Sequence, residues 1–451
     1  MGRRSHHRAL DLWMNGDFVG VWSVQPQAGE MLHYDETWIA SERGRPLSLS
    51  LPFTPGNPPH RGEAVRNYFD NLLPDSQNMR ERVARRFQTG STDAFSLLAE
   101  IGRDCVGAVQ VMPHGQAPEH VTRVDATALS DAQVAQALRT TLTPGPWAGR
   151  NVDDDDEFRI SIAGAQEKTA MLWFDGRWCR PHGATPTTHI FKMPLGLVGN
   201  LKFDMSDSVE NEWLCSEILH AYGMPVARTR PLMFEDMKVL AVERFDRMWW
   251  RNDDGKRWLI RRPQEDMCQA TATPPHLKYE SDGGPGVRTI MKLLATSREP
   301  DVDRRTFFQA QVLFWMLRAT DGHAKNFSIF MRPGGAYALT PLYDVLSAYP
   351  VIGTGANQLS PFKARMAMAV RTRNPHWIMR DILRRHWLAM GAEHGVVAPD
   401  GRGVEAVVDD LVSRTPEVVR LVRDLLSPAF PDHVATPILN GLQAAADRLG
   451  G

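Results

Sequence analysis

Three polar side chains flank one hairpin-like stretch of the 451-residue chain. Asn326 is the fifth residue after Asp321 in the segment ATDGHAKN, and Asp344 follows the run FSIFMRPGGAYALTPLY. A carboxylate at Asp321 can accept the proton of an incoming hydroxyl group. The Asn326 carbonyl and the Asp344 carboxylate are hard oxygen ligands of the kind that Mg²⁺ prefers. Because phosphoryl transfer needs a base and magnesium ligands, these residues predict a site for that reaction.

The order and spacing of these residues are those that protein kinases use. A kinase catalytic loop carries Asp-x-x-x-x-Asn after a helix, and a later Asp binds the metal. The chain predicts a buried helix over 303–320, because apolar residues recur there at helical spacing. Its apolar face is formed by Phe308, Val312, Trp315, Met316 and Ala319. Two strand-like runs around the turn RPGG then deliver Asp344.

Cations that hold the phosphates are also expected. Lys192 ends the strand-like run THIFKM, where it can reach the α and β phosphates, and Glu212 on the next helix can hold it by an ion pair. The segment AGAQEK (163–168) turns between two strand-like runs, so its backbone N–H groups can cover phosphates. This signal is weak, because the segment has one glycine and lacks the strand-to-helix context of a Walker motif.

The elements around these residues predict two lobes. The runs FRISI, TAMLWF, THIFKM and KVLAVERFDR predict a small sheet, and residues 206–223 predict one helix against it. From Asp266 onward the pattern is mostly helical. We therefore expect a kinase small lobe over 151–265 and a helical lobe that carries the catalytic loop over 266–451.

The first 115 residues contain no catalytic constellation, and we interpret them as a structural or partner-binding domain. Asn15-Gly16 between two apolar runs predicts a β-hairpin. The runs MLHYDETWI, PLSLSLPF and GAVQVMP predict further strands, and residues 63–87 predict helix broken at Pro74. Residues 116–150 are polar and rich in Ala, Thr and Pro, which favours a connecting segment, and the acidic run DDDDE follows it.

Composition excludes some classes of protein and leaves others open. The net charge of -1 gives no global attraction to nucleic acid. The four cysteines are far apart, with no C-x-x-C pair, so neither a zinc site nor a disulfide framework is expected. A reducing, cytoplasmic location and no membrane association are predicted, since no apolar run approaches the roughly 18 residues of a spanning helix.

Longer motifs resemble a known family. The segments FRISIAGAQEKTAML, VENEWLC, LAVERFDR, RRPQEDMCQA, KYESDGGPG, ATDGHAKNFSIF and LTPLYDVLSAYP closely resemble the HipA family, the serine/threonine kinase toxins of bacterial type II toxin–antitoxin modules. NYFDNLLPD and FSLLAEIGRDCVGAVQV resemble the N-terminal domain of that family. The resemblance implies an α+β, two-lobed, protein-kinase-like fold with a β-rich N-terminal subdomain and a mostly helical C-terminal lobe.

The resemblance also implies roles for residues of the catalytic lobe. Asp321 would be the catalytic base, Asn326 and Asp344 would bind Mg²⁺, and Lys192 would bind phosphate of ATP. His323 and Tyr343 fall at positions that contact the nucleotide.

The same family pattern extends to the small lobe. The loop formed by Ala163, Gly164, Ala165, Gln166, Glu167 and Lys168 would cover the phosphates. Glu243, Arg244 and Phe245 would line the adenine side. Ser161 matches a serine that is autophosphorylated, and this modification ejects the loop and silences the kinase.

Family members phosphorylate aminoacyl-tRNA synthetases, the glutamyl enzyme in the best-known case, which leads to growth arrest and persistence. They also bind a small helix-turn-helix antitoxin, HipB, that sits on operator DNA. The resemblance implies these partners for this chain.

Two other functions stay open at the level of sequence. The chain can be a catalytically silent binding module, although the intact Lys192, Asp321, Asn326 and Asp344 argue against it. It can also be a small-molecule kinase, because a fold alone does not separate the two substrate classes. Ser161 beside the phosphate loop favours a protein hydroxyl as acceptor. The spacing of QEDMCQ and KYESDGGPG gives no role for either segment.

Overall fold

The computed structural model describes residues 8–25, 29–142, 166–199 and 202–451. The predicted strand FRISI, Ser161, Ala163, Gly164 and Ala165 lie outside the described residues, as does the acidic run 153–157.

The N-terminal domain is an antiparallel sheet with the strand order β4-β3-β2-β1-β5, covered by short helices. The predicted hairpin at Asn15-Gly16 is present, and both residues have positive φ (52° and 91°), as a tight hairpin turn requires. Trp22 stacks on Phe69 at 3.7 Å between ring centroids in its core. Its elements are β1 (Arg8–Met14), β2 (Asp17–Gln25), β3 (Gly29–Tyr34), α1 (Glu36–Ala40), β4 (His60–Arg61), α2 (Glu63–Asp70), α3 (Gln77–Arg86), α4 (Ala94–Ile101) and β5 (Val109–Pro113).

One strand prediction in this domain was wrong, and another was correct only in its first half. Residues 46–53 form turns and bends, because Leu47 and Leu51 are buried while the Ser48 and Ser50 hydroxyls hydrogen-bond to the Gln269 carbonyl of another domain. The alternation of apolar and polar residues there reflects docking between domains. The run MLHYDETWI is a strand only as far as Tyr34, since the Asp35 carboxylate accepts a hydrogen bond from the backbone N–H group of Thr37 and starts α1.

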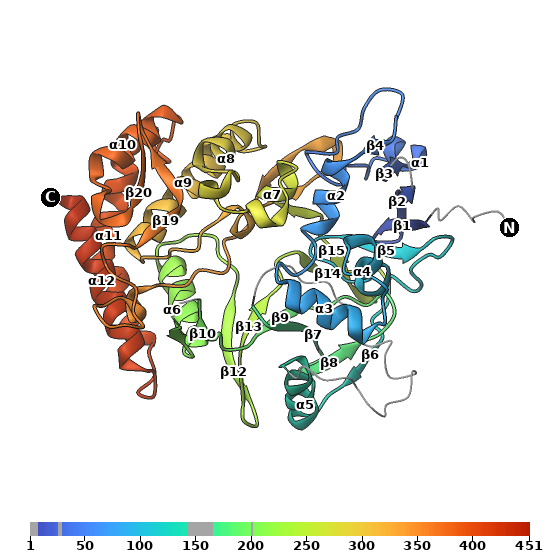
Figure 1. Cartoon of the computed structure of the whole chain (residues 1–451), viewed down its shortest axis with the longest axis horizontal. Coiled ribbons are helices and arrows are strands. Elements are labelled where there is room, and N and C mark those ends of the chain that lie inside the picture. Colours follow the sequence, from blue (N-terminus) through green and yellow to red (C-terminus); the bar gives the residue numbers. More distant parts are fainter. Residues whose placement is uncertain (1–7, 26–28, 143–165, 200–201) are drawn as a thin grey trace.

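The small lobe is built on a second sheet with the order β12-β13-β9-β7-β8-β6. Alternate residues of a strand face opposite sides of its sheet. On β13, Val239 and Ala241 pack in one hydrophobic cluster with α5, while Leu240 and Val242 pack in another with α6. The sheet therefore has a helix on each face, as Figure 1 shows. The elements are β6 (Ala126–Ala128), α5 (Asp131–Leu142), β7 (Lys168–Phe174), β8 (Arg177–Pro181), β9 (His189–Lys192), β10 (Gly196–Val198), β11 (Phe203–Met205), α6 (Ser208–Ala221), β12 (Thr229–Phe234), β13 (Met237–Glu243), β14 (Arg247–Arg251) and β15 (Arg257–Arg261).

The segment 116–150 differs from the connecting segment that we expected. It contains β6, which pairs with β8, and α5, which packs on the small-lobe sheet. Among residues 131–141 of α5, only Val134, Ala135 and Leu138 are fully buried, so the apolar pattern in the sequence is short and was missed.

The large lobe is mostly helical, as predicted, around the buried helix α9. We predicted this helix over 303–320, but it ends at Met316, so Ala319 follows it. All five residues that we assigned to its apolar face are buried. Its described elements are β16 (Gln264–Asp266), α7 (Met267–Ala270), α8 (Val287–Leu294), α9 (Pro300–Met316), β17 (Ser328–Met331), β18 (Tyr337–Leu339), β19 (Arg365–Arg371), β20 (Pro375–Ile378), α10 (Arg384–Glu393), α11 (Val404–Leu425) and α12 (Asp432–Gly450). The N-terminal sheet (blue) and the helices α11 and α12 (red) lie at opposite ends of the molecule (Figure 1).

Candidate active site

The catalytic-loop candidates follow α9 directly. The chain leaves the helix after Met316, passes Asp321, and forms a short 3-10 helix at Ala324–Asn326. The Asn326 side-chain oxygen accepts a hydrogen bond of 3.0 Å from the backbone N–H group of His323, which closes the loop on itself. Asp321 is exposed, whereas Asn326 is buried. An exposed carboxylate beside a fixed, buried carboxamide suits a base that must meet a large substrate.

The β17–β18 hairpin brings Asp344 back to this loop, as the sequence predicted. The Asn326 side-chain amide lies 3.4 Å from Asp344 Oδ2. Asp344 has a φ of 61°, a left-handed conformation that Asp adopts more readily than most residues. Such backbone strain is found at functional sites, where it fixes the direction of a side chain.

Lys192 connects the two lobes. Its ammonium donates to Glu212 Oε1 at 2.6 Å and to Asp344 Oδ1 at 2.8 Å, and its side chain is buried. The ion pair expected between Lys192 and Glu212 is therefore present. Burial raises the pKa of Asp344, but the charges of Lys192 and Lys168 outweigh burial and hold this pKa well below its ordinary value. The Asp344 carboxylate is consequently ionised and ready to bind a cation.

A second lysine stands beside the first. Lys168 on β7 is directly opposite Lys192 on β9 in the antiparallel register, so both side chains project from the same face of the sheet. Burial and the charge of Lys192 lower the pKa of Lys168 to about 8, although Asp344 acts in the opposite direction. Two cations held side by side fit a site for a polyanion such as ATP.

The end of the phosphate-loop segment contacts the N-terminal domain. The Gln166 side-chain amide donates to the Met193 carbonyl at 2.6 Å, and the Glu167 carboxylate forms an ion pair with Arg82 of α3. Of the loop that we predicted, these two residues and Lys168 are the part that the structure describes. Of these three residues, only Lys168 lies next to the cluster formed by Lys192, Glu212 and Asp344.

The adenine-side candidates separate in the structure. Phe245 packs 5.7 Å from Tyr343 between ring centroids, and both border a small cluster that includes Val242. Glu243 is exposed at the end of β13. The Arg244 side chain points elsewhere, because it is buried and bound to carboxylates of Asp246 and Asp104. Its guanidinium is not available to a nucleotide.

His323 and Tyr343 flank the metal-ligand candidates. Burial lowers the pKa of His323, so its imidazole is predominantly neutral at pH 7, and its buried Nδ1 atom has no hydrogen-bond partner among the described residues. The Tyr343 hydroxyl donates to the Lys325 carbonyl at 2.8 Å and lies 2.6 Å from the Ser328 hydroxyl. Tyr343 therefore ties the hairpin to the catalytic loop.

Sequence reasoning missed one residue of the N-terminal domain that reaches this site. Asp75, between α2 and α3, pairs with Lys278 at 2.8 Å and lies 3.5 Å from Lys325 of the catalytic loop. Lys325 also approaches Asp266 at 3.4 Å and donates to the Asn71 side-chain oxygen at 2.8 Å. Asp75 ends the motif NYFDNLLPD, which indicated the family of the N-terminal domain but did not predict any contact of Asp75 with the large lobe.

The segment QEDMCQ, for which spacing gave no role, forms the seam between the N-terminal domain and the large lobe. Glu265 accepts the Leu49 backbone N–H group at 2.8 Å, and the Gln269 amide donates to the Tyr68 carbonyl at 3.0 Å. Asp266 caps α7 through Gln269. The segment is structural, and it holds the N-terminal domain against the catalytic loop.

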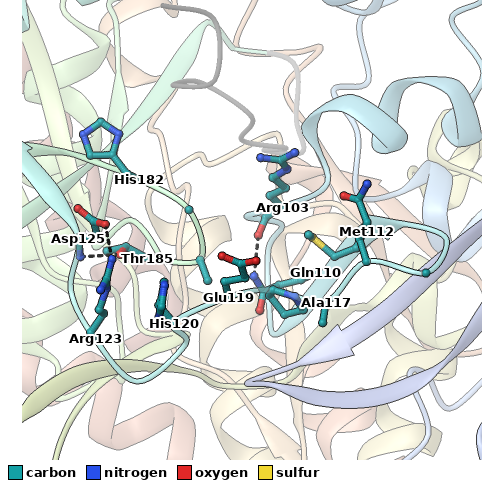
Figure 2. A pocket seen from close by; sticks show the side chains of 15 residues that line it. Arg103, Gln110, Met112, Ala117, Glu119, His120, Arg123, Asp125, His182 and Thr185 are labelled. Carbon is teal, nitrogen blue, oxygen red and sulfur yellow. Dashed lines mark hydrogen bonds and ion pairs between the residues drawn. The ribbon is translucent and has the colours of Figure 1, made fainter. Parts of the chain in front are cut away.

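A separate cavity of about 730 Å³ lies away from these residues, between the N-terminal domain and the small lobe. Figure 2 shows Arg103, Gln110, Arg123, Asp125 and His182 around it. None of the candidate catalytic residues lines this cavity. The candidate active site is instead where Lys192 meets Asp344, beside the loop that carries Asp321 and Asn326.

The described residues contain no helix long and apolar enough to cross a membrane, and no group of three or more His, Cys, Asp or Glu side chains arranged to hold a metal. A magnesium site of the kinase type is smaller than such a group, because substrate phosphates and water complete it. The Asp344 carboxylate, with one further lone pair on the Asn326 carbonyl, fits that need.

Two protein-family models match this chain, one in its N-terminal domain and one across its two lobes. The HipA N-terminal domain model matches residues 10–112, and the HipA-like C-terminal domain model matches residues 160–419. The putative kinase Y4mE of Sinorhizobium fredii is 32% identical over 431 residues, which are 94% of either chain. The serine/threonine-protein kinase toxin HipA of Shewanella oneidensis is 26% identical, covering 80% of this chain and 78% of that protein.

The fold has a solved counterpart. A structure described as the Shewanella oneidensis toxin–antitoxin complex of HipA, HipB and operator DNA superposes with a TM-score of 0.75, at 22% identity, over 97% of both chains. The likeness shows the two-lobed fold with its N-terminal subdomain, as the sequence predicted.

Proposed function

Because this chain belongs to the HipA family, we propose that it is an ATP- and Mg²⁺-dependent serine/threonine protein kinase and the toxin of a toxin–antitoxin module. The observation that carries the proposal is the convergence of Lys192 from β9, Asn326 from the 3-10 helix at Ala324–Asn326 and Asp344 from the chain after β18, beside the loop that carries Asp321. Relatives named as kinases support the same reaction class.

The proposed reaction follows from the residues. The acceptor hydroxyl oxygen forms a bond to the γ-phosphorus, its proton passes to Asp321, and the bond from the γ-phosphorus to the bridging oxygen breaks to release ADP. Lys192 and Lys168 hold the phosphates. Asn326 and Asp344 would hold Mg²⁺, which supplies charge neutralisation on the phosphates when bound. The side chains of Phe245 and Tyr343 offer apolar contact to the adenine ring of ATP.

The test is transfer of label from ATP to protein in the presence of Mg²⁺, with purified chain alone and with a cell lysate. We expect Asp321→Asn and Asp344→Asn each to lose about 10² or more in rate, because one removes the base and the other a metal ligand. Asp301→Asn, an exposed acid on α9, is the matched control and should keep its activity. Near-wild-type transfer by either site variant at saturating ATP and Mg²⁺ would overturn the proposal.

Autophosphorylation of Ser161 is part of the proposal and rests on the family motif, since this residue lies outside the described structure. A phosphate adds about −1.5 to −2 charges near the nucleotide site and should repel ATP. Mass spectrometry after incubation with ATP and Mg²⁺ should find the phosphate on Ser161, with weaker ATP binding by the modified form. An active kinase with unmodified Ser161 would argue against this part alone.

We also propose the partners that the family implies. A helix-turn-helix antitoxin of the HipB type would bind this chain and carry it to operator DNA, in a cytoplasmic setting and without a membrane. Its substrate would be an aminoacyl-tRNA synthetase, the glutamyl enzyme first, which links activity to growth arrest and persistence. The net charge of -1 favours DNA association through the antitoxin. Tight operator binding by the isolated chain would contradict this.

A further inference from the structure

One segment beside the catalytic loop is not part of the proposed reaction. Lys278, Tyr279 and Glu280, which we name the strap, open the motif KYESDGGPG. Lys278 and Tyr279 lie between two short 3-10 helices, and Glu280 begins the second of them. The Lys278 carbonyl accepts a hydrogen bond of 3.2 Å from the backbone N–H group of Ala324. The strap therefore runs alongside the loop that holds Asp321.

The middle residue of the strap touches the proposed base. The Tyr279 hydroxyl donates to Asp321 Oδ1 at 2.5 Å, and its ring meets His323 edge-on at 5.0 Å between centroids. Burial, together with the negative charge of Asp321, raises the pKa of Tyr279 far above its ordinary value. The hydroxyl thus remains a donor throughout the physiological range, and the second carboxylate oxygen of Asp321 is left for a substrate.

Both ends of the strap are anchored by charge. At one end the Lys278 ammonium pairs with Asp75 of the N-terminal domain at 2.8 Å. At the other end the Glu280 carboxylate accepts the Ala369 backbone N–H group at 2.7 Å and pairs with Arg371 of β19 at 2.6 Å. A residue fixed on both sides by partly buried ion pairs holds its own side chain in place.

The glycines of the motif have a packing reason that agrees with this role. A Cβ atom at Gly284 would lie 1.9 Å from the Leu277 carbonyl oxygen, and one at Gly286 would lie 2.1 Å from the Glu280 carboxyl carbon. Contacts this short do not occur, so a larger residue at Gly284 would have to displace the backbone at Leu277 and Tyr279, and one at Gly286 would have to move the Glu280 carboxylate. The two glycines therefore leave room for the Tyr279 backbone and the Glu280 carboxylate.

We propose that Tyr279 is a positioning residue, which fixes the Asp321 carboxylate through Oδ1 so that Oδ2 meets the acceptor hydroxyl. This inference rests on the proposed function. An exposed carboxylate on a loop rotates unless something holds it, and a misplacement of about 1 Å can cost on the order of 10²-fold in rate. The strap thus makes the geometry of the base depend on the large lobe and on the N-terminal domain together.

The test compares Tyr279→Phe with wild type in the same phosphoryl-transfer assay. The change removes one hydroxyl and keeps the ring, so the protein should fold, and thermal unfolding checks that it does. We expect kcat to fall about 10- to 100-fold while the KM for ATP and the affinity for ATP in a binding titration stay unchanged. Tyr222→Phe is the matched control, because its buried hydroxyl binds Thr415 away from the site.

A double variant separates positioning from a general structural effect. If Tyr279 acts through Asp321, adding Tyr279→Phe to Asp321→Asn should cost no further activity. Unchanged kcat in Tyr279→Phe would overturn the inference, as would a parallel loss of kcat and ATP affinity or an additive double variant. These results differ from a failure of the proposed function, in which wild type transfers no phosphate or Asp321→Asn stays active.

Discussion

Lys168 and Lys192 form a pair of like charges directly opposite each other on neighbouring strands, which is unfavourable on its own. Lys192 is compensated by two carboxylates: burial lowers its pKa, but Asp344 and Glu212 outweigh burial and raise it above its ordinary value. The positive charge of Lys168 is compensated less, and its pKa therefore falls to about 8. A ligand with several negative charges would relieve this imbalance.

We therefore predict different losses for the two lysines. Lys192→Met should reduce kcat by about 10² or more, because it removes the cation that is fixed between Glu212 and Asp344. Lys168→Met should weaken ATP binding about tenfold, or roughly 1.4 kcal/mol, with a smaller change in kcat. Steady-state kinetics and nucleotide titration measure both quantities. Lys238→Met, on the neighbouring strand β13, is the control, and equal effects of all three changes would contradict the assignment.

At the residue level the sequence predicted those parts of the site that lie on regular local patterns. Asp321, Asn326 and Asp344 were assigned to one candidate site because a helix and a hairpin fix their spacing, and Lys192 was assigned to it because it ends a strand. Tyr279 was missed since its partner is 42 residues away, and Asp75 since its partners Lys278 and Lys325 are 203 and 250 residues away. No local pattern encodes such contacts.

At the level of elements, helix α6 carries Glu212 against Lys192, and the small-lobe sheet carries Lys192 against Asp344. Strand β13 was predictable from its short continuous apolar run, which is buried on both faces of the sheet, and helix α9 from apolar residues that recur about every 3.6 residues. Helix α5 was not, since few of its residues are buried. Residues 46–53 were wrongly predicted as a strand. Their apolar and polar residues alternate because the serine hydroxyls bind the Gln269 carbonyl of the large lobe.

The ion pair between α6 and β9 leads to a prediction about magnesium. In Glu212→Gln, Lys192 keeps Asp344 as its one charged partner among the described contacts, so it should compete more strongly with Mg²⁺ for that carboxylate. We expect the Mg²⁺ concentration at half-maximal activity to rise several-fold, which a magnesium titration at saturating ATP measures. Glu210→Gln, two residues away and paired with Lys238, should leave it unchanged. An unaltered requirement in Glu212→Gln would show that α6 does not tune the metal site.

At the scale of the whole molecule, the N-terminal domain is joined to the small lobe by a buried charge cluster. Asp104, which is 5% exposed, lies within 3.3 Å of guanidinium nitrogens of Arg244, Arg247 and Arg261 and accepts the Thr187 hydroxyl at 2.8 Å. Asp246 binds Arg244 from the other side. Together with the QEDMCQ seam, this cluster makes the N-terminal domain part of the framework that holds the candidate active site.

Removal of Asp104 should therefore destabilise the whole chain. Asp104→Asn leaves three buried arginines with less negative charge around them, and breaking such a network costs about 3–5 kcal/mol. Urea unfolding followed by circular dichroism measures the change. Asp409→Asn breaks an exposed pair with Arg384 and should cost no more than about 1 kcal/mol. Similar losses in the two variants would mean that the cluster does not hold the domains together.

The same cluster predicts how stability depends on pH. Burial raises the pKa of Asp104, but Arg247, Arg244 and Arg261 outweigh burial and bring it well below the ordinary value of about 3.9. A carboxyl with a depressed pKa contributes stability that is complete above the ordinary value and is lost as the pH falls towards the folded one.

Wild type should therefore lose unfolding free energy between pH 5.5 and 3.5, with the steepest fall below about pH 4. Each proton that only the unfolded chain binds contributes about 1.4 kcal/mol per pH unit. In Asp104→Asn this carboxyl cannot titrate, so the curve should start lower at pH 5.5 and fall less steeply. Urea unfolding at several pH values gives both curves. Parallel curves would show that Asp104 takes up its proton equally in the folded and unfolded chains, and that the buried arginines do not hold it ionised.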